Sequence, residues 1–169
     1  MSKPDLTRVP AFYHNYIAQV QQENLADAFN AHQNQFVQLL ETLPTDKWNY
    51  KYAEDKWTIK GLVQHVIDAE RIFNYRGLCI ARKESASLPG FDENTYAAAS
   101  KAAQRNSVEL IAELKTVQQS TRLLFSSFDE EQLNAIGTAN NSSIYVNAIG
   151  FIIIGHALHH QKILKERYL

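Results

Sequence analysis

The chain has 169 residues, of which 45% are hydrophobic and 21% are charged, so we expect one globular domain over residues 1–169. Seventeen lysine and arginine residues against eighteen aspartate and glutamate residues give a formal net charge of −1, which argues against a nucleic-acid-binding protein because no broad basic surface is available. The single cysteine, Cys79, excludes an internal disulfide and is typical of a reducing compartment.

The longest apolar run covers residues 151–154, far fewer than the roughly 20 residues of a membrane span. We therefore expect a cytoplasmic protein that does not enter a membrane. The sequence also has no glycine-rich phosphate loop, no serine nucleophile elbow and no Cys-x-x-Cys motif. Its unusual feature is histidine, with six residues in all and three of them close together near the C-terminus.

Apolar residues recur at helical spacing in four long segments, and no alternating stretch is long enough to predict a strand. The sequence therefore predicts an all-α protein. In chain order, the expected helices cover residues 10–20, 25–43, 59–82, 92–103, 105–127 and 143–167, with one further turn over 129–134.

The expected connections fall at proline, glycine and polar clusters. Pro44 ends the helix over 25–43, and Thr58 and Asp92 are suitable N-cap residues for the helices that follow them. We expect an ordered aromatic loop over residues 45–57 and a polar loop over 137–143. Four long helices indicate a four-helix bundle, a fold whose interior often carries metal sites.

His156 and His160 lie in the middle of the apolar stripe of the last predicted helix. At about 100° per residue, both fall within about 20° of Ile149, and their i, i+4 spacing places the two imidazoles on one face. Paired histidines of this spacing bind zinc in metalloprotease helices. Burying two imidazoles without partners costs on the order of 1–3 kcal/mol each, so the pair favours a metal site.

His65 is the third candidate ligand, because it flanks the buried face of the helix over 59–82. A bundle can bring it opposite His156 and His160. Three neutral imidazoles leave coordination positions open for water or substrate, the pattern of a catalytic site rather than a structural one. Spacing alone also allows a hydrogen-bonded core histidine at this position.

Five further residues are candidates for the surroundings of the metal or for a pocket. His32 lies in the apolar stripe of the helix over 25–43, and His159 lies at the edge of the last stripe. Glu70 is a candidate partner that orients a ligand histidine, and Gln118 faces the apolar side of its helix. Arg76 shares the side of His65, but about 16 Å away along the helix axis, so only a long substrate would contact both. Each of these residues also has a purely structural interpretation.

The chain resembles the DinB and YfiT-like superfamily of metalloenzymes over about residues 10–168. The resemblance is carried by segments that occur in the family's order: Trp57-Thr58-Ile59-Lys60 leading to His65, Asp68-Ala69-Glu70-Arg71, Tyr75-Arg76, Leu88-Pro89-Gly90-Phe91, and Gly155-His156 with His160.

This resemblance implies an up-down-down-up four-helix bundle that holds a divalent metal through His65, His156 and His160. Characterised members include metal-dependent transferases of low-molecular-weight thiols such as bacillithiol, a mycothiol-dependent isomerase, and domains of enzymes that form sulfoxides. Many other members have no assigned reaction.

We therefore expect a divalent metal ion, zinc or nickel, and a small-molecule thiol that reacts with an electrophilic substrate as the leading function. A metal-dependent hydrolase is the second hypothesis, and a metal- or ligand-binding module without turnover is the third. The last helix is apolar beyond its main stripe, at Phe151, Ile154 and Leu158, and a second subunit could cover that face. We expect a homodimer on that ground.

Overall fold

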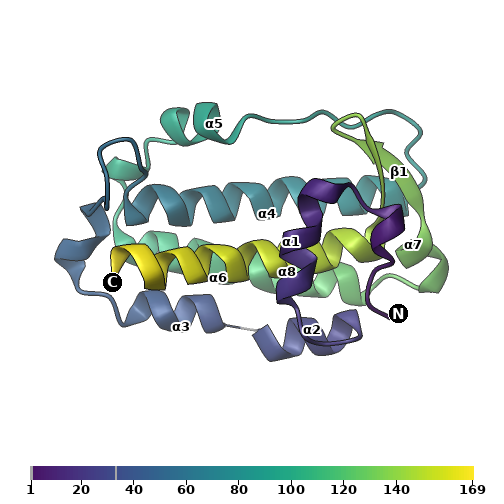
Figure 1. Cartoon of the computed structure of the whole chain (residues 1–169), viewed down its shortest axis with the longest axis horizontal. Coiled ribbons are helices and arrows are strands. Elements are labelled where there is room, and N and C mark those ends of the chain that lie inside the picture. The colour runs from purple at the N-terminus through teal and green to yellow at the C-terminus, as the bar shows by residue number, and fades with distance from the viewer. Residues whose placement is uncertain (1, 33) are drawn as a thin grey trace.

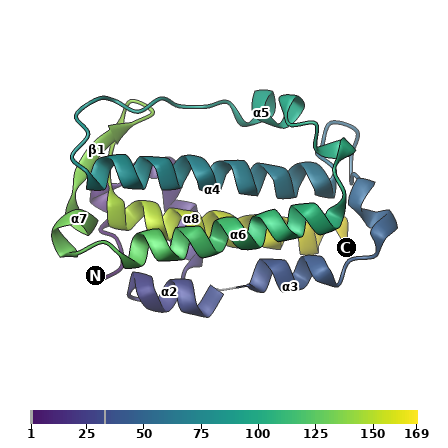
Figure 2. The ribbon, with the colours of Figure 1, turned by 180° about the vertical axis from the view of Figure 1, so that it is seen from behind.

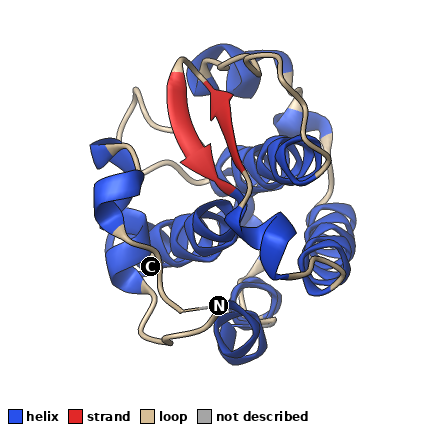
Figure 3. Cartoon of the chain, turned by 90° about the vertical axis from the view of Figure 1, so that its right-hand side faces the viewer, coloured by secondary structure: helices blue, strands red, loops and turns tan. Residues whose placement is uncertain are grey.

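The computed structural model describes residues 2–32 and 34–169 and is built almost entirely of helices (Figures 1 and 3). The short N-terminal helix α1 covers His14–Gln19, and two 3₁₀ turns, Leu6–Arg8 and Ala11–Tyr13, precede it. The remaining α-helices are α2 (Leu25–His32), α3 (Gln35–Glu41), α4 (Ile59–Ala81), α5 (Glu93–Ala99), α6 (Ser107–Ser126), α7 (Glu130–Asn134) and α8 (Val146–Ile163). The all-α prediction is confirmed.

The bundle is formed by α4, α6, α8 and, as its fourth member, α2 together with α3 (Figures 1 and 2). The helices α4 and α6 run in the same direction, whereas α8 and the α2–α3 pair run in the opposite one. Two consecutive parallel helices need a long connection that returns the chain to the starting end of the bundle. Residues 82–106 form this connection along the outside of α4, and they include α5. The bundle is therefore up-down-down-up, as the resemblance implied.

The long helices begin where the sequence offers caps. The Thr58 side chain accepts a hydrogen bond from the backbone N–H of Gly61, and Asp92 and Asn106 cap α5 and α6 in the same way. These residues satisfy backbone groups that the first helical turn leaves unpaired. The N-caps predicted at Thr58 and Asp92 are confirmed.

The prediction of one helix over 25–43 was wrong, because the structure has two helices there. Asn34, the N-cap of α3, has a φ of 64°, in the left-handed region that an α-helix cannot include. The apolar stripe continues across the break, with Leu25, Phe36 and Leu40 all buried. Periodicity therefore located the buried face correctly, whereas the left-handed backbone of Asn34 is incompatible with one continuous helix.

A second correction concerns residues 136–145, which form an antiparallel β-hairpin rather than a loop and the start of a helix. Strand β1 covers Ile136–Ala139 and β2 covers Ser142–Tyr145. Their register leaves Asn140 and Asn141 as a two-residue turn, and both have positive φ, as a type I′ turn requires. The last helix consequently begins at Val146 and not at Ser143.

The second apolar face of α8 is covered within the chain. Helix α1 crosses α8 and α2 packs beside it, so that Phe151 is fully buried and Ile154 is 5% exposed (Figure 1). An additional subunit is therefore not needed to cover these side chains, and the homodimer stays a prediction. None of the helices in the described part of the chain is long and apolar enough to cross a membrane.

Candidate metal centre

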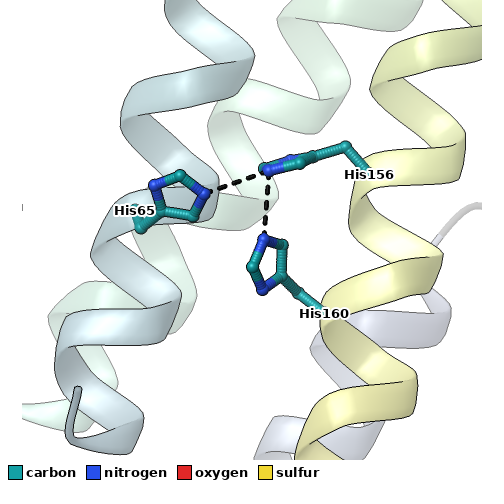
Figure 4. Close-up of side chains that lie close together, drawn as sticks. All are labelled: His65, His156 and His160. Atoms are coloured by element: carbon teal, nitrogen blue, oxygen red, sulfur yellow. Dashed lines mark hydrogen bonds between the residues drawn. The ribbon is translucent and has the colours of Figure 1, made fainter. Parts of the chain in front are cut away.

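Helices α4 and α8 bring His65, His156 and His160 together. The two helices pack antiparallel, so the beginning of α4, which carries His65, lies beside the last turns of α8. His156 and His160 are four residues apart and point from one face of α8 toward α4 (Figure 4). The three residues predicted as a metal site thus meet in space, although 91 positions separate His65 from His156.

The distances between the imidazoles fit ligands of one ion. Nε2 of His156 lies 3.0 Å from Nε2 of His65 and 3.1 Å from Nε2 of His160, and ligand nitrogens of all three lie within 4.8 Å of one another. Two nitrogens that each lie about 2.0–2.1 Å from one zinc ion would be separated by roughly 3.0–3.4 Å. The contacts through His156 therefore have the spacing of a shared ion.

Hydrogen bonding alone cannot explain this cluster. A nitrogen of a neutral imidazole carries either one hydrogen or one lone pair, so Nε2 of His156 can complete only one of its two contacts. A cation that accepts one lone pair from each Nε2 atom would satisfy all three rings. The donor set of this chain therefore fits a divalent metal ion.

The histidines are buried, and burial keeps them in the form that can coordinate a metal. They are 9%, 6% and 8% exposed, in sequence order. Desolvation lowers the pKa of His65 to about 4 and holds the pKa values of His156 and His160 well below the ordinary value. All three rings are consequently neutral near pH 7, with their lone pairs available.

Aromatic rings fix the orientation of two of these imidazoles. The Trp57 ring centroid lies 4.8 Å from that of His65, and Tyr16 packs edge-on against His156 at 5.4 Å. Sequence analysis identified neither residue as part of the site. The sequence position of Trp57, directly before the N-cap of α4, could have indicated that it lies near His65. Nothing in the sequence indicates the position of Tyr16, because only the crossing of α1 over α8 brings it to His156.

The three histidines line a cavity of about 400 Å³. Trp57, Tyr16, Phe73 and Phe91 contribute aromatic walls, and the exposed residue Glu93 lies at its edge at the start of α5. An ion held by the histidines would therefore have a face directed toward a space that a small molecule can occupy. Catalytic metal sites have an open side of this kind, whereas structural sites are usually closed by a fourth protein ligand.

Arg76 and His159 lie at the same cavity. His159 contacts Tyr16 and His160 through ring centroids 5.4 and 5.2 Å apart, but its nitrogens do not belong to the convergent group. Arg76 is 3% exposed and lines the cavity together with the histidines. The structure thus places both residues in the surroundings of the candidate metal centre.

The other three candidates, His32, Glu70 and Gln118, line a different cavity of about 450 Å³, which shares no residue with the first. Glu70 points away from His65, because five residues rotate the side chain by about 140° around α4. Its Oε1 atom contacts the hydroxyl of Thr121. Within the described residues, Glu70 makes no hydrogen bond to a histidine, and Nδ1 of His160 is buried without a partner.

His32 is also separate from the candidate metal centre. Its Nε2 atom donates a hydrogen bond to Oε1 of Gln22, at 3.0 Å, and its Nδ1 atom lies 3.4 Å from Oε1 of Gln35. Gln22 precedes α2, and Gln35 is the first residue of α3. Of the five residues predicted to surround the metal or a pocket, two therefore line the cavity of the three histidines, namely Arg76 and His159. The other three line the second cavity, namely His32, Glu70 and Gln118.

Comparison with known families gives one match over most of the chain. The model of the DinB superfamily matches residues 28–164, a stretch that includes all three convergent histidines. No curated protein matches the sequence.

Solved structures that share the fold include two from Bacillus subtilis. The first is YfiT from Bacillus subtilis, described as a probable metal-dependent hydrolase with an unusual four-helix bundle topology. It superposes with a TM-score of 0.69 and 15% identity, over 96% of this chain and 91% of that one. The second is the DinB-like protein YjoA from Bacillus subtilis, with a TM-score of 0.59 and 21% identity, over 83% of this chain and 87% of that one. At these identities the likeness concerns the fold.

Proposed function

This chain belongs to the DinB superfamily, and from that membership we propose that it is a metal-dependent enzyme whose active centre is formed by His65, His156 and His160. One observation carries the proposal: three buried, neutral imidazoles converge on one point at the wall of a cavity. A structural site would normally be closed by a fourth protein ligand. The arrangement here leaves a side directed toward the cavity.

The three histidines would hold a zinc or nickel ion through their Nε2 atoms. When bound, a divalent ion lowers the pKa of a coordinated thiol or water molecule and so supplies a nucleophile near neutral pH. Trp57 and Tyr16 hold the rings of His65 and His156 in position by packing against them. The aromatic walls provide apolar surface beside the histidines where a substrate would lie.

We propose that the nucleophile is a low-molecular-weight thiol and that the second substrate is a carbon electrophile bound in the same cavity. The thiol proton leaves to solvent, sulfur forms a bond to the electrophilic carbon, and the leaving group departs with its bonding pair. The chain's own Cys79 does not line the cavity, so the thiol would come from a small molecule. Neutral ligands leave a net positive centre, which suits a thiolate.

Hydrolysis is the second candidate, and Glu93 favours it. This carboxylate lines the cavity, and its charge opposes the lowering of the His65 pKa by burial. A carboxylate at that place can accept a proton from an attacking water molecule. Thiol transfer does not need this group, so the variant Glu93→Gln separates the two reactions.

The first experiment is elemental analysis of protein purified without a histidine tag. We expect close to one divalent ion per chain in the wild type and a loss of metal in His65→Ala and His156→Ala. The matched control is His32→Ala, a histidine outside the cluster, which should retain the metal. A wild-type protein that binds no divalent ion after reconstitution would contradict the proposal.

The second experiment uses the metal-loaded protein with panels of thiols and electrophiles, and separately with ester and amide panels. Conjugation that depends on both the thiol and the metal is the expected result, and it should persist in Glu93→Gln. Ester or amide cleavage that Glu93→Gln reduces would favour hydrolysis instead. Stoichiometric metal without turnover on either panel would identify a binding module.

A further inference from the structure

Arg76 is a buried cation for which the structure provides no acidic partner. Its side chain is 3% exposed, and no carboxylate among the described residues lies within the 4 Å of an ion pair. One terminal nitrogen, Nη2, donates to the carbonyl oxygen of Pro89 at 2.7 Å. Nε is buried and has no hydrogen-bond partner.

An unpaired buried charge is costly, because the lost hydration is not replaced. The Pro89 carbonyl, the Tyr13 hydroxyl, which interacts with the guanidinium, and the face of Phe73, whose centroid lies 5.8 Å from the guanidinium carbon, compensate only in part, because none of them carries a negative charge. The guanidinium is planar and presents its N–H groups in a fork that matches a carboxylate or phosphoryl group. The missing partner is therefore best supplied by an anionic oxygen group from outside the chain.

The position of Arg76 connects this requirement to the candidate metal centre. Both line the same cavity, and the ring of Phe73 lies between them, 6.2 Å from the His156 ring and 5.8 Å from the guanidinium carbon. Among the described residues that line the cavity, Glu93 alone is acidic, and it is exposed at the cavity's edge. One small molecule can therefore reach the histidines with one end and the arginine with the other.

Tyr13 adds a hydrogen-bond donor at the arginine end of the cavity. Its ring lies 6.0 Å from that of Phe73, and the side chain is half-buried. Burial raises the pKa of its hydroxyl, although the Arg76 charge opposes that rise. The phenol is consequently neutral near pH 7 and able to donate to an anion beside the guanidinium.

We propose that Arg76 forms an anion-binding subsite that selects substrates carrying a carboxylate or phosphoryl group, and that the Phe73 ring separates this subsite from His156. The subsite itself follows from the burial and hydrogen bonding of Arg76. Its role in orienting a reacting group toward the histidines rests on the proposed function. Arg76 is thus a specificity residue that touches the substrate's anionic end.

The test of the subsite compares two ligands of the same shape, hexanoate and hexanamide, by calorimetry on metal-free protein. Charge-assisted hydrogen bonds predict that the wild type binds hexanoate about tenfold or more tightly than hexanamide. Arg76→Gln should lose this preference. The control is Arg71→Gln on the same helix, because Arg71 is exposed and already paired with Glu113, and this variant should keep the preference.

Inorganic phosphate serves as a third probe. Arg76-dependent binding of phosphate without a preference for hexanoate would identify a phosphoryl group as the natural anion. Equal binding of hexanoate and hexanamide to the wild type, together with no binding of phosphate, would overturn the proposal. A preference for the anion that survives in Arg76→Gln would overturn it as well. The two-ligand comparison on wild-type protein needs no variant, so it can overturn the proposal even if Arg76→Gln does not fold.

A second measurement tests the link to the candidate metal centre. Straight-chain thiols with a terminal carboxylate, in a series of increasing length, are titrated into metal-loaded protein, with terminal amides as controls. We expect the affinity to peak at one length and the peak to disappear in Arg76→Gln. If the chain binds no metal but still prefers hexanoate, the proposed function fails while the subsite stands. A length series with no peak would show that Arg76 does not orient ligands toward the histidines.

Discussion

Glu70, Asn74 and Thr121 meet at a single buried hydroxyl group between α4 and α6. The Thr121 hydroxyl oxygen lies within hydrogen-bond distance of Glu70 Oε1, of the Asn74 amide nitrogen and of the Val117 carbonyl oxygen. A hydroxyl group has one hydrogen and two lone pairs. All three contacts are satisfied together only if Thr121 donates to Val117, Asn74 donates to Thr121, and Glu70 carries a proton that it donates to Thr121.

The environment of Glu70 agrees with this assignment. Complete burial raises the pKa of its carboxyl group to about 7, against a partial opposing effect of the contact with Thr121. Glu70 is therefore largely a neutral acid at slightly acidic pH. Its part in the structure is to complete the hydrogen bonds between two helices.

The raised pKa predicts how stability depends on pH. Between pH 4.5 and 7 the folded state holds a proton on Glu70 that the unfolded state has lost, so the free energy of unfolding falls as the pH rises through this range. The total contribution is on the order of 3 kcal/mol. We expect Glu70→Gln, which stays neutral, to match the wild type near pH 5 and to be more stable at pH 8.

Urea unfolding of both proteins at several pH values measures this difference. Because the histidines titrate alike in both proteins, the difference between the two curves isolates Glu70. A difference that does not change between pH 5 and pH 8 would show that Glu70 is ionised throughout. Asp68→Asn provides a comparison with a half-buried carboxylate on the same helix that accepts a hydrogen bond from Gln64.

At the scale of the elements, the crossing of α1 over α8 depends on Gly155. A Cβ atom on Gly155 would lie 2.1 Å from the backbone carbonyl oxygen of Tyr16. A backbone group cannot rotate away as a side chain can, so only glycine permits this approach. The crossing also places the Tyr16 ring against His156, the residue next to Gly155.

Gly155→Ala should therefore displace α1 and lower the free energy of unfolding by roughly 1–3 kcal/mol, the usual cost of overpacking. The matched control is Gly77→Ala in α4, whose Cβ would lie 3.1 Å from the side-chain ring of Phe125 rather than from a backbone atom. There the higher helix propensity of alanine, worth about 1 kcal/mol, offsets the closer contact. Urea unfolding measures both variants, and equal effects would refute a special role for Gly155.

The hairpin turn gives a second prediction at this scale. Asn141 has a φ of 58°, in the left-handed region that asparagine tolerates and β-branched residues avoid. Asn141→Val should lower the free energy of unfolding by about 1–2 kcal/mol, whereas Asn141→Gly should leave it nearly unchanged. Chemical unfolding of the two variants tests this, and a valine variant as stable as the glycine variant would contradict it.

At the scale of the whole molecule, the metal should stabilise the fold because its ligands come from two helices that only the folded state brings together. Binding at a free concentration 100 times the dissociation constant contributes about 2.7 kcal/mol. For a domain of this size, that corresponds to an increase in the melting temperature of roughly 5–10 °C. Removal of the metal by a chelator should lower the melting temperature by this amount.

Calorimetry with and without chelator measures the effect. His65→Ala should melt near the metal-free wild type and should not respond to the chelator, whereas His32→Ala should respond as the wild type does. A wild-type protein whose melting temperature does not change on reconstitution or chelation would contradict a shared site.

The predicted homodimer is tested by the mass that light scattering measures at micromolar concentration. The chain mass is 19.3 kDa, so a dimer should have twice this mass and a monomer would contradict the prediction.

The sequence by itself determined the helical character of the long segments, their buried faces and the shared face of His156 and His160, and it made His65 a candidate third ligand. Helical periodicity is a local property, and the i, i+4 spacing of His156 and His160 places both on one face whatever surrounds the helix. The same local rules missed the left-handed Asn34 and the Asn140–Asn141 turn, because one or two residues in an uncommon conformation leave the apolar pattern unchanged.

Only the tertiary structure decided which residues share a cavity. It placed Arg76 with the histidines and Glu70 with Gln118 on another side of α4, although both charged residues lie on one helix. It also brought Tyr16 and Trp57 to the candidate metal centre through the crossing of α1 and the entry into α4. The physical reason is that such contacts depend on how helices cross and which backbone atoms can approach, and these distances are set by packing between segments far apart in the chain.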